Sequence, residues 1–143
     1  TLAIVSDQVP YSMLKRDIED ELVPYTIKNN VGIIAYSPLE RGLLTGKYFK
    51  GETLQEKDHR NSYFNQFDLD KVQVFLKKLE VLAKEKNVAV SQLVLRWTTL
   101  QPGITIVLAG ARNPTQAIQN AKAMEITIDN DEMKFINKAL SEI

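Results

Sequence analysis

The sequence predicts an α/β fold built on a parallel sheet. Short aliphatic runs without a helical period alternate with longer stretches whose apolar residues recur every three or four positions. Runs of the first kind are typical of strands buried on both faces, and stretches of the second kind are typical of amphipathic helices. Strands that alternate with helices are joined by crossovers and therefore run parallel. On pattern alone, an open doubly wound sheet is the alternative to a closed barrel.

Composition excludes several classes of function. The 143 residues include 18 basic and 18 acidic side chains, which cancel, so neither nucleic acid nor an anionic membrane is expected as a partner. The absence of cysteine excludes disulfides and thiolate chemistry and fits a cytoplasmic protein. No apolar run reaches the roughly 20 residues that span a bilayer.

The amino-terminal third is expected to hold two strands and one helix. The first strand is predicted at 2–6, with a polar exit at 7–12. A helix is predicted over 18–29, and Asn30-Val31-Gly32 should end it. Its apolar side is assigned to Ile18, Leu22, Tyr25 and Ile27, and Pro24 should start or kink it.

The second strand is the apolar run Ile33–Tyr36, which Pro38 brings to an end. Residues 42–46 then read as a flexible connection at the carboxyl end of that strand, the end at which parallel sheets bind ligands. The polar stretch 50–65 lacks an apolar period and is predicted to be a long loop.

The remaining elements carry clear capping signals. Asp68 should cap a helix that runs to about Asn87, Ser91 should cap a second helix ended by Pro102-Gly103, and 104–108 is the third buried strand. Two further helices are predicted, one capped by Asn113 with Pro114 at its first position, and one with a capping box formed by Asp129 and Glu132.

The residues alone offer no catalytic set. His59 is the single histidine and lies in the polar loop, and Ser37 has neither a Gly-x-Ser-x-Gly frame nor a histidine partner. Acidic residues at 17–21 read as a solvated helix start, and no metal-ligand spacing occurs.

Three ordered motifs resemble the aldo-keto reductases. Ala35–Leu39 with Gly42–Tyr48 resembles the end of that family's seventh strand and the following loop. Gln8–Leu14 is similar to the end of its sixth strand, and Gly110–Asn113 with Gln116 and Asn120 to the end of its eighth strand and the next helix. The resemblance implies that residues 1–143 are the carboxyl-terminal portion of a (β/α)8 barrel, with about three strand–helix units and a final helix. The motifs are closer to bacterial-type reductases and potassium-channel β-subunits than to mammalian aldose reductase.

The resemblance also implies a binding site for NADPH. Gln8 matches the residue that bonds the nicotinamide carboxamide, and Tyr36 matches the aromatic that stacks on the ring. The loop with Gly42 matches the pyrophosphate segment, and Asn113 begins a helix whose free amides and dipole should attract a phosphate. Arg112 and Gln116 match positions near the 2′-phosphate, and Asn120 the adenine contact. The complete cofactor-binding set is Gln8, Tyr36, Ser37, Pro38, Leu39, Gly42, Gly110, Arg112, Gln116 and Asn120.

Each assignment has a structural alternative. Gln8 would otherwise cap a strand end, Tyr36 would belong to the core, and Gln116 would close a capping box with Asn113. The family's catalytic Asp, Tyr, Lys and His positions lie upstream of Thr1, so the resemblance assigns no catalytic residue here.

The expected activity of the whole protein is hydride transfer between NADPH and an aldehyde or ketone, with a tyrosine acid from the missing half. Alone, the chain should be inactive and should associate with that half or with itself, because a partial barrel leaves two open edges. The alternatives are a redox-sensing subunit like the channel β-subunits, and a non-enzymatic remnant.

Overall fold

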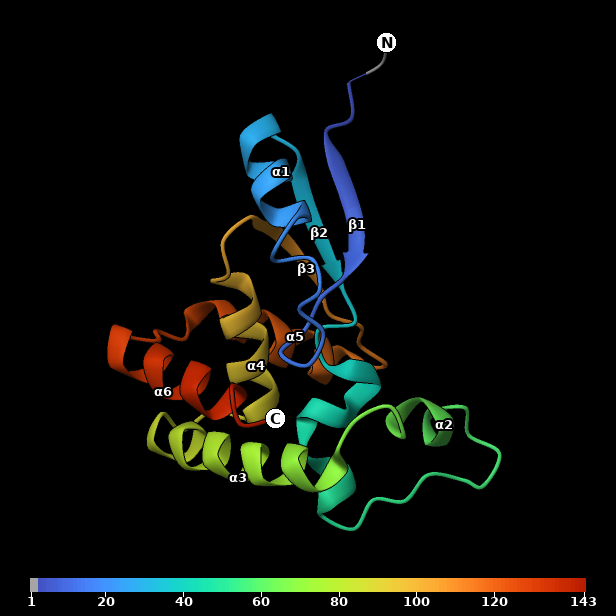
Figure 1. Ribbon diagram of the computed structural model, residues 1–143. Helices are drawn as coiled ribbons and strands as arrows, with labels where there is room; N and C mark the ends of the chain where they lie inside the picture. Colours follow the sequence, from blue (N-terminus) through green and yellow to red (C-terminus); the bar gives the residue numbers. More distant parts are fainter. Residues whose placement is uncertain (1–2) are drawn as a thin grey trace.

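The computed structural model describes residues 3–143. Its strands form one parallel sheet in the order β1-β2-β3, with β1 at Ser6–Pro10, β2 at Gly32–Tyr36 and β3 at Ile104–Leu108. The α-helices are α1 (Leu22–Asn29), α2 (Arg60–Phe64), α3 (Leu69–Glu85), α4 (Val90–Thr99), α5 (Pro114–Lys122) and α6 (Asn130–Leu140). Three short 3₁₀ helices are η1 (Glu40–Thr45), η2 (Lys47–Phe49) and η3 (Ala123–Glu125). The predicted α/β class with a parallel sheet is confirmed (Figure 1).

The first strand was predicted too early in the chain. It runs over Ser6–Pro10, not over 2–6, and Leu2 lies outside the described residues. Pairing with β2 decides its position, because Ser6 is opposite Gly32 and Pro10 is opposite Tyr36. Polar residues that read as a strand exit are therefore part of the strand.

Helix α1 is shorter than predicted and buries a different face. It starts at Leu22, which places Pro24 in the first turn, where a missing N–H costs no helical hydrogen bond. Val23 and Thr26 are buried, whereas Tyr25 and Ile27 are 62% and 54% exposed. Asn30, at φ 55°, ends the helix as predicted.

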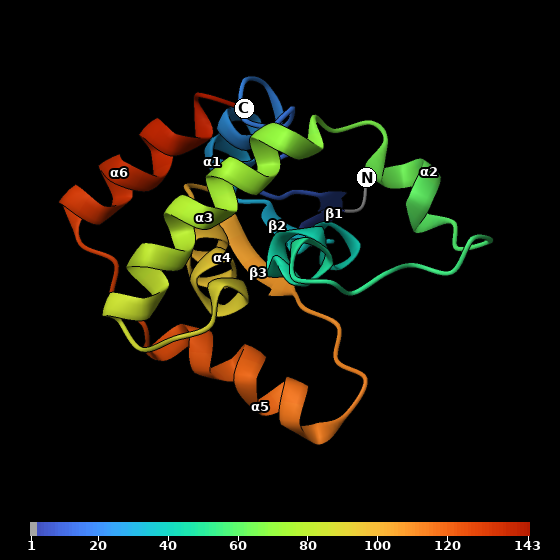
Figure 2. The same ribbon diagram turned by 90° about the horizontal axis from the view of Figure 1, so that it is seen from below.

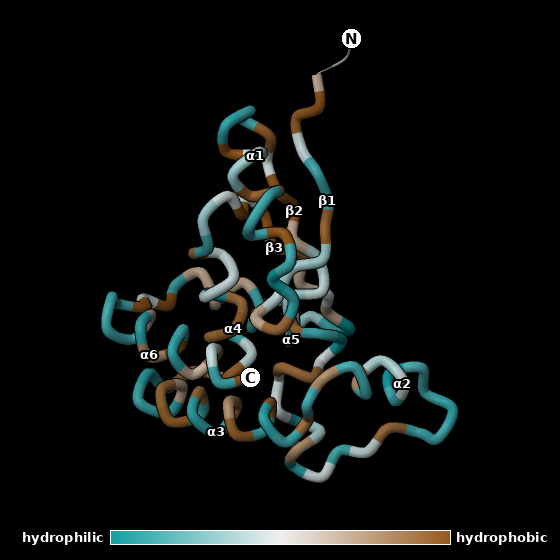
Figure 3. Tube along the Cα trace, viewed as in Figure 1, coloured by the Kyte–Doolittle hydropathy of each residue, from teal (hydrophilic) through white to brown (hydrophobic). Residues whose placement is uncertain are grey.

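The chain after β2 is more regular than the flexible connection and long loop that were predicted. Residues 42–46 lie within η1 and its C-cap, and the stretch 50–65 contains the five-residue helix α2. Figure 3 shows that much of this stretch is hydrophilic, which explains why its short helix has no apolar period to reveal it.

The capping signals were mostly correct. Asp68 accepts a hydrogen bond from the N–H of Lys71, and the carboxylate of Asp129 accepts from the N–H of Glu132 at 2.9 Å. Helix α4 is the exception, since its N-cap is Ala89 and not Ser91. Gln92 explains the shift, because its Oε1 accepts from the N–H of Ala89 at 2.9 Å.

Strand β3 matches its predicted bounds and contains a bulge. Ile33 pairs with Ile104 but Ile34 pairs with Ile106, so Thr105 is the extra residue. After the bulge, Ile106 and Leu108 point to the same side of the sheet as Ile34 and Tyr36.

This side is largely uncovered, although the strands were predicted to be buried on both faces. Tyr36, Ile106 and Leu108 are 39%, 49% and 43% exposed, whereas Ile33 and Ala35 on the other side are fully buried. Helices α1, α3, α4 and α6 gather on that buried side of the sheet (Figure 2). We call the uncovered side, formed by Gln8, Ile34, Tyr36, Ile106 and Leu108, the open sheet face.

The core lies between the buried side of the sheet and the helices. Trp97 is fully buried, stacks on Tyr11 at 6.2 Å and donates from Nε1 to Asn137 at 3.0 Å. Tyr11 in turn donates to Glu19, which also pairs with Arg16. Glu19 is therefore a structural residue and not part of a purely solvated acidic face. None of the helices within residues 3–143 is long and apolar enough to cross a membrane.

Candidate functional site

A cavity of about 790 Å³ opens at the carboxyl ends of β2 and β3. One wall is the chain that follows β2, including Ser37, Leu39 and Gly42, and the opposite wall is the chain from Leu108 into α5. Tyr48 from η2, His59 and Arg60 at the start of α2, and Ser91 from α4 also line it. All of the sequence-predicted binding residues line this cavity except Gln8 and Tyr36.

Gln8 and Tyr36 lie on the open sheet face, which adjoins the cavity. Tyr36 is followed directly by Ser37 of the cavity wall, and its partner in β3, Leu108, lines the cavity as well. Both side chains are accessible, since Gln8 is exposed and Tyr36 is 39% exposed. The alternative that Tyr36 is an ordinary core residue therefore does not describe its surroundings within residues 3–143.

The cavity wall is cationic. It includes Arg41, Lys47, Arg60 and Arg112 together with His59, and no aspartate or glutamate of the described part of the chain lines it. Of these, only Arg112 was predicted from sequence. Arg41 and Lys47 lie beside Gly42 and Gly46, and the glycines were the part of this motif that was interpreted. Arg60 lies in α2, a helix that the sequence did not reveal because it has no apolar period.

Two of these cations are paired and two are available. Lys47 pairs with Glu52 at 2.9 Å, and Arg60 makes a two-pronged contact with Asp58. The hydrogen bonds from Arg60 hold the pKa of the Asp58 carboxyl well below its usual range. Within residues 3–143, Arg41 and Arg112 have no carboxylate within ion-pair distance, so their charge remains available to an anion.

Tyr48 lies between two of the cations of the wall. Its hydroxyl accepts a hydrogen bond from Nη1 of Arg60 at 2.7 Å, and the Nζ of Lys47 lies 4.8 Å from its ring centroid. Its ring packs against Phe64 with 5.3 Å between the ring centroids, which connects η2 to α2. His59, by contrast, has a side chain that is 77% exposed, as expected for a solvated loop histidine.

The wall that follows β2 has an unusual backbone. Ser37, Glu40 and Arg41 have φ values of 58°, 47° and 54°, and Gly42 has a φ of 96°. Left-handed conformations are unfavourable for residues other than glycine, by about 1–3 kcal/mol each. Such a cluster persists only where its surroundings fix it, and here it turns the chain sharply around the mouth of the cavity.

The wall that follows β3 is fixed by side-chain amides. Asn113 accepts from the N–H of Gln116 at 2.9 Å, and Gln116 Oε1 accepts from the N–H of Arg112 at 2.8 Å. Asn120 donates to the carbonyl of Gly110 at 3.2 Å. The expectation of free amides at the start of α5 is therefore wrong for these two N–H groups, because capping side chains already bind them. The Arg112 guanidinium, and not these amides, is what this wall offers to a phosphate.

This donor set fits an anionic ligand that also carries flat, apolar parts. Unpaired guanidinium groups bind phosphates through parallel hydrogen bonds. The cavity is large enough for a cofactor-sized molecule, since ligand pockets typically measure about 300–1,000 Å³. The adjoining open sheet face presents an aromatic ring, against which a planar group would stack.

Comparisons with known proteins agree with this arrangement. The profile of the Aldo/keto reductase family matches residues 1–141. Aldo-keto reductase YhdN of Bacillus subtilis is 34% identical over 137 residues, which cover 93% of this chain and 41% of that protein. A probable voltage-gated potassium channel subunit beta of Arabidopsis thaliana is 29% identical over 127 residues, or 85% of this chain and 39% of that protein.

The fold comparison gives the same result. The glycerol dehydrogenase of Gluconobacter oxydans superposes with a TM-score of 0.83 at 30% sequence identity, over 95% of this chain and 42% of that one. The thermostable aldo-keto reductase Tm1743 superposes with a TM-score of 0.67 over 96% of this chain and 40% of its own.

The chain therefore spans about two fifths of the proteins it matches, and its α/β fold is that of part of a (β/α)8 barrel. The helix-free open sheet face is the side of these strands that faces the barrel interior in a closed barrel. From the match to residues 1–141, the chain belongs to the aldo/keto reductase family.

Proposed function

We propose that this chain is the NADPH-binding, carboxyl-terminal part of an oxidoreductase that interconverts carbonyl compounds and alcohols. The observation that carries the proposal is the cavity at the ends of β2 and β3, whose wall, over residues 3–143, contains four cations and no carboxylate. Its position relative to the strands is the one at which barrels of this class bind ligands.

Different residues of the site would bind different parts of the dinucleotide. Arg112 and Gln116, beside the start of α5, would hold the 2′-phosphate, and Asn120 would contact the adenine. The turn from Ser37 to Gly42 would follow the pyrophosphate. Tyr36 and Gln8, on the open sheet face, would hold the nicotinamide end.

Tyr36 would decide which face of the nicotinamide is exposed. A flat ring stacked on one face leaves only the other face open to a substrate. When bound, NADPH supplies the hydride for the carbonyl carbon. The remaining task of this chain's residues is to bind and orient the cofactor and to exclude water from the apolar face formed by Tyr36, Ile106 and Leu108.

The carbonyl oxygen also needs a proton donor beside the nicotinamide. Tyr48 lines the cavity, but its hydroxyl lies beside Gly42, on the expected path of the pyrophosphate, and not beside Gln8 and Tyr36. We propose that the general acid lies outside this chain, so that the chain alone does not reduce carbonyls.

The test is turnover, measured as oxidation of NADPH in the presence of 4-nitrobenzaldehyde. The full gene product should turn over at a rate typical of enzymes, about 1 per second or more, and the isolated chain should not. Turnover by the isolated chain at such a rate would contradict the proposal that the general acid lies outside this chain.

A second candidate is a regulatory subunit that holds the same cofactor and acts through a partner. It is supported by the likeness to probable potassium channel β-subunits over 85% of the chain. The full gene product would then bind NADPH tightly but consume it very slowly with simple aldehydes. The same assay therefore separates the two candidates.

A further inference from the structure

Helix α5 forms one wall of the cavity but is loosely attached to the rest of the chain. It carries Gln116 and Asn120, yet none of its residues is buried, and all of them except Asn120 are exposed. Figure 2 shows α5 set apart from the group formed by α3, α4 and α6, with α4 as its neighbour. Apolar packing, which holds most helices in place, therefore contributes little to the position of α5.

One side chain of α4 supplies the hydrogen bonds that hold α5. The Nε2 group of Gln92 donates to the backbone carbonyl of Gln119 at 2.8 Å and to the Oε1 of the same residue at 3.0 Å. Over residues 3–143, no other side-chain hydrogen bond joins α5 to another helix or strand, because the remaining ones stay within 110–120. The contact between Gln92 and Gln119 is therefore the main polar attachment of α5.

The other end of the Gln92 amide is fixed to α4. Its Oε1 accepts from the N–H of Ala89, the N-cap of α4, at 2.9 Å. Gln92 is only 6% exposed, so both ends of a buried amide are satisfied, as burial requires. Because α4 holds the oxygen, the direction in which Nε2 donates is set as well.

The contact lies between two hollows of the surface. The cavity is on one side, and a polar groove of about 540 Å³ lined by Lys86, Gln92 and Lys122, among others, is on the other. Gln119 lines both of them. Helix α5 therefore has room to shift relative to α4 once the two hydrogen bonds are lost.

We propose that Gln92 is a positioning residue, which holds α5 where its side chains can meet the adenosine end of the cofactor. Gln92 does not itself line the cavity, so it acts through α5. The inference rests on the proposed function and deepens it, because it gives the adenosine end of the site a support on another helix. Without this support α5 would occupy its binding position for only part of the time, and the apparent affinity would fall by the same fraction.

Two variants of Gln92 separate its contact with α5 from its contact with α4. Gln92→Glu keeps the shape, and one carboxylate oxygen can still accept from the N–H of Ala89, as in a capping box. The other oxygen cannot donate and would face the two oxygens of Gln119, so the attachment of α5 is lost while the cap of α4 remains. Gln92→Leu removes both contacts and adds no charge.

The matched control is Gln101→Glu. Gln101 also donates from Nε2 to a backbone carbonyl, that of Trp97 at 2.9 Å, but it lies beyond the carboxyl end of α4. The control therefore makes the same chemical change in a similar amide without touching α5.

The test combines titration of the chain with hydrogen exchange. The ligands are NADPH, NADH and adenosine 2′,5′-bisphosphate, which contains the adenosine end alone. Both Gln92 variants should weaken all three about tenfold, as expected if α5 keeps its binding position about a tenth of the time. In Gln92→Glu the amides of α5 should exchange faster with solvent, whereas those of α4 should not. Gln101→Glu should change neither affinity nor exchange in α5.

Three results would overturn the proposal. A loss found in Gln92→Glu but not in Gln92→Leu would reflect repulsion between the new carboxylate and the phosphates. Weaker binding of NADPH and NADH with unchanged binding of the bisphosphate would place the effect outside the adenosine end. Faster exchange spread equally over α4 and α5 would indicate a general loss of stability and not a shift of α5.

Failure of the proposed function gives a different result. If the unchanged chain binds none of the three nucleotides, the proposed function is wrong, and the role of Gln92 in cofactor binding is wrong with it. If the unchanged chain binds them and both Gln92 variants bind them as tightly, only the inference about Gln92 is wrong.

Discussion

The side chain of Gln116 accepts a hydrogen bond from the backbone N–H of Arg112, with 2.8 Å between the two heavy atoms. The contact closes the loop between β3 and α5 before any ligand arrives, and it turns the two residues toward the same cavity. Gln116 was expected either to contact the cofactor or to close a capping box. The bond resembles a capping box, except that Gln116 binds the N–H of Arg112, the residue before the Asn113 cap, and not the N–H of Asn113 itself.

Replacing Arg112 with alanine should change the cofactor preference. NADPH carries a 2′-phosphate where NADH carries a hydroxyl, and a guanidinium without a carboxylate partner should favour the phosphate by about 1–3 kcal/mol. Fluorescence titration of Arg112→Ala should therefore show NADPH weakened about tenfold or more, with NADH nearly unchanged. The salt dependence of NADPH binding should also become flatter.

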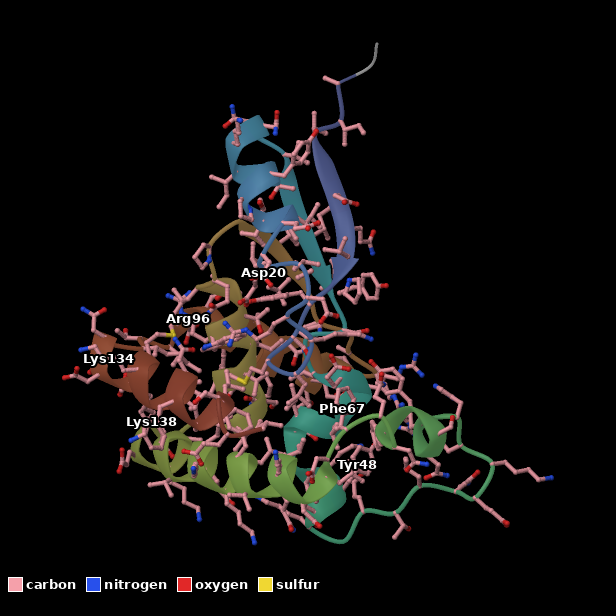
Figure 4. All side chains as sticks on the ribbon, in the orientation of Figure 1. Asp20, Tyr48, Phe67, Arg96, Lys134 and Lys138 are labelled. Atoms are coloured by element: carbon pink, nitrogen blue, oxygen red, sulfur yellow. The ribbon has the colours of Figure 1, made fainter. Side chains whose placement is uncertain are left out.

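Lys134→Ala is the control for this experiment. It removes one positive charge from α6, away from the cavity, as the positions of Lys134 and Tyr48 in Figure 4 show. An equal loss for both cofactors in Arg112→Ala would show that Arg112 does not distinguish them.

Alkaline pH should destabilise the chain partly through Tyr63. Burial, and then the hydrogen bond to Glu40, raise the pKa of Tyr63 to about 12 from an ordinary value of about 10. Because the folded state favours the protonated hydroxyl, this stabilisation is complete below about pH 10 and is lost as the pH rises through about 12. Burial also raises the pKa of Tyr11, so Tyr63 accounts for only part of the loss.

Denaturant unfolding between about pH 8 and pH 12 would measure this effect. Tyr63→Phe should be less stable than the unchanged chain at about pH 8, and the difference between them should shrink toward about pH 12. The Tyr25→Phe variant should follow the unchanged chain throughout. A constant difference for Tyr63→Phe would mean that ionisation of Tyr63 is not coupled to folding.

The cap of α6 should contribute measurably to stability. Asp129 accepts from the N–H groups of both Asp131 and Glu132 at 2.9 Å, and its own N–H donates to Glu132 at 2.7 Å. Asp129→Ala should lower the free energy of unfolding by about 1 kcal/mol, as loss of an N-cap usually does. Asp131→Ala, which removes an exposed acid from the same turn, should cost clearly less. Equal losses would indicate that helix-dipole charge matters here and not the cap.

The open sheet face should make the isolated chain self-associate. Tyr36, Ile106 and Leu108 expose apolar surface, and the outer edges of β1 and β3 are unpaired within residues 3–143. Light scattering should show species larger than a monomer, and Ile106→Lys should reduce them. Ile118→Lys, on the exposed side of α5, is the control and should have little effect. A single monomeric species in the unchanged chain would contradict this expectation.

Local signals in the sequence were the reliable ones. Asp68, Asn113 and Asp129 were predicted as caps because an N-cap depends on residues two or three positions away. The loops around Gly42 and Gly110 were placed correctly beside one cavity, because parallel strands bring their carboxyl ends to one edge.

Two failures were local, since neighbouring side chains moved the cap of α4 from Ser91 to Ala89 and occupied the amides at the start of α5. Other failures involve distant partners. The bounds of β1 follow from its register with Gly32, which no property of 2–10 reveals. The buried carboxylate of Glu40 accepts hydrogen bonds from Tyr63 and Ser12 across 23 and 28 positions of the chain, so neither spacing nor propensity could indicate these contacts. Arg60 was missed for the same reason, since its place in the cavity depends on how α2 folds back.

The most direct test of the central claim is an NMR titration of the isotope-labelled chain with NADPH. If the cavity binds the cofactor, saturable shifts should appear in the amides of 37–48 and 108–120, and Tyr36 should shift as the nicotinamide approaches the open sheet face. The amides of α6 should stay unchanged. No saturable shift up to about 1 mM NADPH, a concentration at which even weak specific binding is visible, would contradict the claim. Shifts confined to the polar groove around Lys86, Lys122 and Thr127 would contradict it as well.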